Sequence, residues 1–164
     1  MVPIFTSAAD LFEATRDAVR ERDRSLRMLR SLEQRDLGAH GGSIAGGGVS
    51  GGARDVRALT DARLDHESRL HRSISECDEL VDYACAVLYG ADQTGESGGL
   101  YVLIDHAAAD VLCLHYCQDM TWDATAMALG LNRRDCFRAR LRALEYIDSH
   151  GVAAVIAGDG GAAA

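Results

Sequence analysis

A glycine-rich segment over residues 38–54, GAHGGSIAGGGVSGGAR, separates two helical patterns and does most to limit how the chain can fold. Glycine at this density holds neither a helix nor a strand, so the segment is predicted to be a flexible linker. It lacks the preceding strand and the following Lys-Ser/Thr pair of a phosphate-binding loop. The chain is therefore expected to form one long helix before the linker and another after it.

Each flanking segment has an apolar stripe with heptad spacing, which predicts a long amphipathic helix. The first helix is expected over residues 8–37 with Ser7 as its N-cap, and Thr15 and Arg22 interrupt its stripe. The second is expected over about residues 54–88. Its stripe alternates spacings of four and three through Leu70, Ile74, Cys77, Val81, Ala84 and Leu88.

The same stripes are buried whether the two helices fold back as one antiparallel hairpin or pair between two chains. The sequence leaves both arrangements open, so a homodimer through residues 8–37 and 56–88 is an alternative to the hairpin. In both cases residues 1–90 form an arm that serves oligomerisation or binds a partner protein.

After a second loop at residues 90–99, helical patterns resume. Further helices are expected over about residues 100–118, 121–129 and 133–150. No segment shows sustained period-two alternation of β-branched residues, so the predicted fold class is all-α. The helical domain is expected over 99–150, and the small-residue segment 151–164 is expected to be a flexible tail.

The whole chain is acidic, with a net charge of −8 over 164 residues, which argues against a general nucleic-acid coat or a basic membrane binder. The N-terminus has no secretory signal pattern, and no segment is apolar enough to span a bilayer. The five cysteines are an odd number without a paired framework, so reduced, buried thiols in a cytoplasmic protein are expected.

The sequence offers no recognisable catalytic constellation. A nucleophile–base pair, a phosphate loop and a carboxylate pair at a defined pocket are all absent from it, so enzymatic activity is not expected. Cys113, His115 and Cys117 are close in sequence but provide too few converging ligands for a metal site. No metal and no cofactor is therefore predicted.

The stretch TWDATAMALGLNRRDCFRARLRALEYI, residues 121–147, fits two helices joined by a tight turn better than one continuous helix. A helix-turn-helix needs a small residue where its helices cross, a glycine in the turn and an apolar inner face on its second helix. Ala126 and Gly130 meet the first two needs. The inner face is expected to contain Cys136, Leu141 and Leu144, with Trp122 in the core beneath it.

The outer face of the second helix is basic. Between Leu131 and Leu144 there are five Arg and one Asp, a local net charge of +4. Such a face suits double-stranded DNA, because phosphate neutralisation provides most of the affinity and the first turns of a recognition helix read base edges. The candidate DNA-binding residues are Asn132, Arg133, Arg134, Phe137, Arg138 and Arg142.

Two of these candidates have an alternative structural role. Asn132 can reach an adenine edge or simply cap the last helix. Phe137 can contact a thymine methyl group or cover the edge of its own core.

Residues 111–144, VLCLHYCQDMTWDATAMALGLNRRDCFRARLRAL, resemble region four of bacterial sigma factors. They are still more similar to phage-encoded, sigma-like transcriptional regulators of the ArpU/RinA type. The residues that match are Leu114, Tyr116, Thr121, Trp122, Ala126, Leu129, Gly130, Arg133, Ala143 and Leu144. The residues that depart are His115 for Arg, Asp119 for Gly, Thr125 for Ile and Asn132 for Ser.

The resemblance implies a phage- or prophage-derived regulator of transcription that reads the major groove with residues 133–150 and contacts RNA polymerase. It covers the last third of the chain closely, and the upstream arm only as an arrangement. Two other classes stay open. One is a DNA-packaging protein similar to a small terminase, although such proteins usually carry their DNA reader at the N-terminus. The other is a helical adaptor that does not bind DNA, to which the acidic charge and the Thr125 hydroxyl point.

Overall fold

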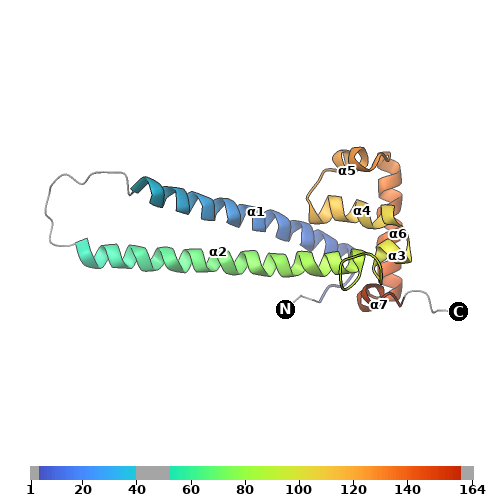
Figure 1. Cartoon of the computed structure of the whole chain (residues 1–164), viewed down its shortest axis with the longest axis horizontal. Helices are drawn as coiled ribbons and strands as arrows, with labels where there is room; N and C mark the ends of the chain where they lie inside the picture. The colour runs from blue at the N-terminus through green and yellow to red at the C-terminus, as the bar shows by residue number, and fades with distance from the viewer. Residues whose placement is uncertain (1–3, 40–51, 160–164) are drawn as a thin grey trace. The chain divides into compact units, whose positions relative to one another are not determined.

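The computed structural model of the chain describes residues 4–39 and 52–159, and its regular secondary structure in these ranges is entirely helical, as predicted. The long helices α1 (Ala8–Ala39) and α2 (Gly52–Tyr89) form an antiparallel pair within one chain (Figure 1). The shorter elements that follow are α3 (Leu100–Leu103), α4 (His106–Leu112), the π-helical turn η1 (Cys113–Cys117), α5 (Trp122–Leu129), α6 (Arg133–His150) and α7 (Val152–Ala157). The middle of the predicted linker, residues 40–51, lies outside the described residues.

The start and the inner face of α1 follow the sequence pattern. Ser7 caps the helix, because its Oγ accepts a hydrogen bond from the N–H of Asp10 at 3.1 Å. Thr15, which interrupts the apolar stripe, is buried. Its hydroxyl is nevertheless hydrogen-bonded, because Oγ1 donates to the Leu11 carbonyl at 2.8 Å. Over residues 8–35 of α1, the buried side chains are Ala8, Leu11, Phe12, Thr15, Val19, Ser25 and Leu29.

The chain divides into two compact units, and the division falls inside the long helices rather than at the loop 90–99. The first unit comprises Met1–Arg20 and Cys77–Ala164, and the second comprises Glu21–Glu76. The first holds the main core, whose largest fully buried side chains include Phe12, Leu88, Leu100, Leu112, Tyr116, Ile147 and Val155. The base of the hairpin therefore belongs to the same packed body as the helices of the predicted helix-turn-helix.

The single helix predicted over residues 100–118 is wrong, because the chain breaks at Ile104 and Asp105. Ile104 leaves the helical region with φ −117° and ψ −80°. Asp105 then caps α4, since its Oδ1 accepts from the N–H of Ala108 at 2.7 Å. An aspartate in this place favours a new helix start over a continuous helix.

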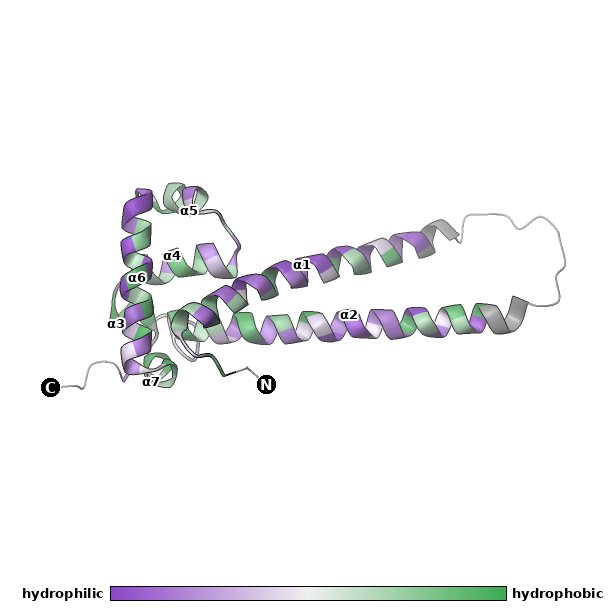
Figure 2. Cartoon of the chain, turned by 180° about the vertical axis from the view of Figure 1, so that it is seen from behind, coloured by the Kyte–Doolittle hydropathy of each residue, from purple (hydrophilic) through white to green (hydrophobic). Residues whose placement is uncertain are grey.

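The segment 151–164, predicted to be a flexible tail, begins with the short helix α7. Its residues are mostly hydrophobic (Figure 2), and Val155 is fully buried. The Val155 carbonyl accepts a hydrogen bond from the N–H of Gly99 at 2.9 Å. The periodic pattern is too short to predict this helix, whose stability comes from docking on the core. Among the described residues, no helix combines the length and apolar character needed to cross a membrane.

Candidate nucleic-acid interface

The predicted tight turn lies between α5 and α6. Thr121 caps α5 by accepting from the N–H of Ala124 at 3.2 Å. The helix ends at Gly130, whose φ of 63° and ψ of 28° lie in the left-handed region that favours glycine. The N–H of Leu131 closes the turn by donating to the Ala126 carbonyl at 2.9 Å. The sequence prediction of two helices joined through glycine is confirmed.

Helices α4, α5 and α6 pack against one another around a small core of their own. Its buried members are Val111, Ala126, Cys136 and Ala139, with Trp122, Leu129 and Leu131 partly buried around them. The expected inner position of Leu141 is wrong, because this side chain is 55% exposed. Leu141 lies two residues from both Ala139 and Ala143, about 200° around the helix from each of these buried positions.

All six candidate DNA-binding residues are exposed on α6 or at its start. Asn132 is nevertheless occupied as the helix cap: its Oδ1 accepts from the N–H of Asp135 at 2.8 Å, and its Nδ2 donates to Asp135 Oδ2 at 2.6 Å. Of the two roles that the sequence left open, capping is the one that the structure contains. Asn132 therefore fixes where α6 begins.

Three of the four candidate arginines are paired with carboxylates. Arg133 lies 3.6 Å from Asp123, Arg138 lies 3.7 Å from Asp135, and Arg142 forms an ion pair with Asp105. These side chains are more than half exposed, and surface pairs of this kind contribute about 0–1 kcal/mol each. An incoming phosphate can therefore replace the carboxylates at little energetic cost.

Arg134 and Arg140 differ from these three. Arg134 is exposed and has no ion-pair partner among the described residues. Arg140 points the other way, where its Nε donates to the Tyr116 hydroxyl at 2.6 Å, so it serves packing.

Phe137 covers the edge of the core, which is one of its two expected roles. Its ring centroid lies 4.7 Å from that of Trp122, and Trp122 in turn stacks on His115 with centroids 3.6 Å apart. Phe137 still exposes 40% of its surface, and the Arg133 guanidinium lies 5.6 Å from its ring centroid. The outer face of α6 therefore has an aromatic patch beside its arginines.

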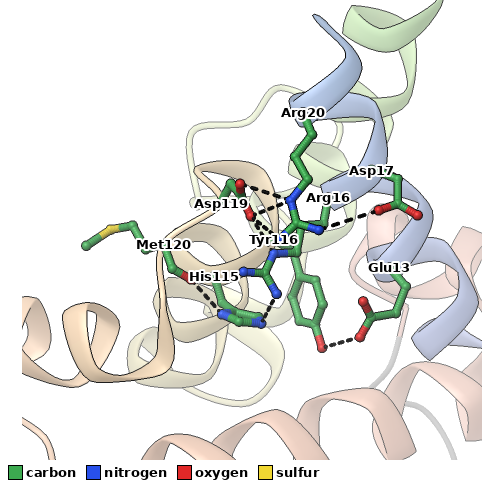
Figure 3. A network of polar contacts seen from close by, with 8 residues as sticks. All are labelled: Glu13, Arg16, Asp17, Arg20, His115, Tyr116, Asp119 and Met120. Carbon is green, nitrogen blue, oxygen red and sulfur yellow. Dashed lines mark hydrogen bonds and ion pairs between the residues drawn. The ribbon is translucent and has the colours of Figure 1, made fainter. Parts of the chain in front are cut away.

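His115, which stacks on Trp122, is also part of a polar network (Figure 3). His115 Nδ1 lies 2.8 Å from the Met120 carbonyl, so this nitrogen is assigned the proton. The Nε2 atom then accepts from Arg16 Nη1 at 3.0 Å. Burial and the charge of Arg16 lower the pKa of His115, which keeps the imidazole neutral.

Asp119 ties the start of the α5 segment to α1. Its Oδ1 accepts from Arg16 Nε at 2.6 Å, and Arg20 Nε contacts both carboxylate oxygens at 3.1 and 3.0 Å. The hydrogen bond from Arg20 holds the pKa of this carboxyl below its usual range. Asp119 also has φ +50°, in the left-handed region, at the position where the sigma-like pattern has glycine.

The sequence did not identify Arg16, Arg20 or Tyr116 as residues that position this surface. Arg16 and Arg20 look like ordinary members of a solvated helix face. The only signal in the sequence was Asp119 in place of the pattern's glycine, because a charged side chain at that position suggests an ion-pair partner.

Thr125 lies where the pattern has isoleucine. It is fully buried, and its hydroxyl has no hydrogen-bond partner among the described residues. Within the part of the chain that the structure describes, no group of three or more His, Cys, Asp or Glu side chains is arranged to hold a metal ion.

Comparison of the chain with protein-family models, with curated proteins and with solved structures finds no match. The resemblance to sigma region four therefore stays a prediction from the sequence.

Proposed function

We propose that this chain is a sequence-specific, double-stranded-DNA-binding regulator of transcription that places α6 in the major groove. The observation that carries the proposal is the α5–Gly130–α6 turn, which presents four exposed arginines on the first turns of the second helix. This local positive face belongs to a chain of net charge −8. A duplex requires such a face, and a recognition helix reads bases with its N-terminal residues.

The individual arginines are suited to different contacts. Arg134 and Arg138 lie four residues apart on one face, and both extend from the first two turns of α6. We assign them to guanine edges, which arginine binds in a bidentate manner. Arg133 and Arg142, whose carboxylate partners lie on α5 and before α4, are assigned to phosphates.

Not every departure from the sigma-like pattern weakens the resemblance. Asp119 takes the left-handed conformation that glycine would take there. His115 is buried and stacks on Trp122 of α5, whereas the buried Thr125 hydroxyl has no partner among the described residues and counts against the resemblance. Contact with RNA polymerase follows from the resemblance alone.

Fluorescence anisotropy with a labelled random-sequence duplex across a salt series tests the proposal. We expect the wild-type chain to bind, and Arg133→Ala/Arg142→Ala, which lacks the two arginines assigned to phosphates, to bind at least tenfold more weakly at low salt. The slope of log K against log salt should flatten by about two, because two phosphate contacts are lost. Selection of bound sequences from a random pool then tests specificity, which Arg134→Ala/Arg138→Ala, without the two arginines assigned to guanine edges, should lose.

The matched control is Arg57→Ala/Arg69→Ala, which removes the same charge from exposed positions of α2. This variant should bind within about twofold of the wild type. Equal weakening by Arg133→Ala/Arg142→Ala and by this control would show that net charge, rather than the α6 face, governs binding.

A helical adaptor that does not bind DNA is the second candidate, favoured by the carboxylate partners of three arginines. The variant Asp123→Asn/Asp135→Asn separates the two. A DNA reader should bind more tightly once the competing carboxylates are neutral, whereas an adaptor should show no binding at any salt concentration. A ring-shaped assembly by light scattering would instead favour the DNA-packaging class.

A further inference from the structure

Three of the five cysteines lie in or against the main core of the first compact unit. Cys85 comes from α2, and Cys113 and Cys117 are the first and last residues of η1. Cys117 belongs to the main core, and Cys85 and Cys113 pack against that core. All three are free thiols, with Cys117 buried and the other two half-buried.

The backbone at this cluster is unusual. The N–H of Gln118 donates to the Cys113 carbonyl at 3.1 Å, a bond that spans five residues instead of the four of an α-helix. Single π-helical turns of this kind occur frequently at functional sites. Here the turn begins at one thiol and ends at another.

The surroundings of Cys113 favour its thiolate. The Gln118 side chain lies within hydrogen-bond reach, with Nε2 at 3.9 Å from the sulphur. The neighbouring Cys117 thiol is the main reason that the pKa of Cys113 falls to about 6, against the opposing effect of burial. The same interaction raises the pKa of Cys117, which stays protonated.

The two cysteines therefore have different chemical roles. A half-buried thiolate is the form that reacts with peroxides. A neighbouring thiol is the partner that such an oxidised cysteine requires. Side chains four residues apart on a helical turn have Cβ atoms about 5–6 Å apart, so a small local shift brings the sulphurs into bonding range.

We propose that Cys113 and Cys117 form a peroxide-sensitive pair that closes to a reversible disulfide. The Cys113 thiolate attacks hydrogen peroxide, forming an S–O bond and breaking the O–O bond, with one water released after protonation. The Cys117 sulphur then attacks the Cys113 sulphenic sulphur: the S–S bond forms, the S–O bond breaks, and the departing hydroxide takes the Cys117 proton to leave as the second water. Two thiols are oxidised by two electrons, and one peroxide is reduced to two waters.

Disulfide mapping of the full chain after treatment with hydrogen peroxide tests this directly. Trypsin cannot separate the two cysteines, because no Lys or Arg lies between Arg72 and Arg133, so chymotrypsin is needed to cut at Leu114 or Tyr116. We expect a Cys113–Cys117 linkage that disappears with dithiothreitol. Linkage of Cys85 to Cys117, or no linkage at peroxide levels that oxidise Cys136, would overturn the assignment.

Single variants resolve the two steps. In Cys117→Ser the reaction should stop at a sulphenic acid on Cys113, trapped by dimedone, and in Cys113→Ser neither residue should be oxidised. Cys136→Ser is the matched control, because this buried thiol lies in the small core of α4, α5 and α6 with a raised pKa. It should leave the wild-type rate unchanged, and Cys136 itself should react about tenfold more slowly than Cys113.

Discussion

The two compact units are built on the same two helices, yet they bury their apolar residues to very different degrees. In the first unit Phe12, Leu88 and Tyr116 are completely buried. In the second unit Val56 and Leu59 of α2 remain 62% and 71% exposed. Heptad spacing is therefore enough to pair two helices, but full burial requires the further layer that the shorter helices provide in the first unit.

The largest expected effect comes from the same substitution at two points of α2. Leu88→Ala should lower the free energy of unfolding by about 2–5 kcal/mol, because it leaves a cavity in the main core. Leu59→Ala should change it by less than about 0.5 kcal/mol, since little surface is buried there. Urea unfolding followed by circular dichroism measures both, and similar losses would contradict the contrast between the units.

A smaller effect is expected from the backbone at Asp119. Asp119→Gly and Asp119→Ala both remove the contacts with Arg16 and Arg20, but only glycine adopts the positive φ freely. The alanine variant should therefore be less stable than the glycine variant by about 1–2 kcal/mol. At Asp61, an exposed residue within α2 of the second unit, the order should be reversed. There the alanine variant should be more stable than the glycine variant by about 1 kcal/mol.

Each unit contains one buried hydroxyl without a hydrogen-bond partner among the described residues, Thr125 in the first and Ser25 in the second. Thr125→Val keeps the shape of the side chain and should raise the free energy of unfolding by about 1 kcal/mol. Ser25→Ala should raise it by a similar amount. A loss at either site, measured by urea unfolding, would show that the hydroxyl is satisfied in solution.

The smallest effect is a pH dependence that belongs to the first unit. Because burial lowers the pKa of His115 in the folded chain, the unfolded chain takes up the proton first as the pH falls below about 6.5. Stability should therefore decrease from pH 7.5 to 5.5. Thermal unfolding should show a smaller decrease for His115→Gln and an unchanged one for His71→Gln, an exposed site in the second unit.

Local signals allowed much of the fold to be predicted from the sequence. Ser7 and Asn132 were predicted as helix caps and Gly130 as a turn, because capping and positive φ depend on neighbouring residues. The range 133–150 of the last helix was predicted as the structure has it. These features bring the six exposed candidates together around α6.

Features that depend on distant residues could not be predicted. In the sequence, Asp105 resembles an ordinary polar residue within one helix. The break there becomes evident only when α4 is seen packed against its neighbours. Leu141 is an apolar residue, as expected in a core, but its side chain projects from the exposed side of α6. Only the packed orientation of α6 reveals this. The contact of Arg16 with Asp119 joins residues more than a hundred positions apart, and no spacing rule connects them.

The two kinds of glycine in this chain have different consequences for its evolution. At Gly130 an added Cβ would meet nothing within 4 Å, so glycine is favoured there only by the positive φ of the backbone. At Gly99 an added Cβ would collide with the backbone of Gly90 and Leu88. In relatives of this chain we therefore expect the turn before α6 to drift between glycine and asparagine, while the glycine before α3 stays invariant.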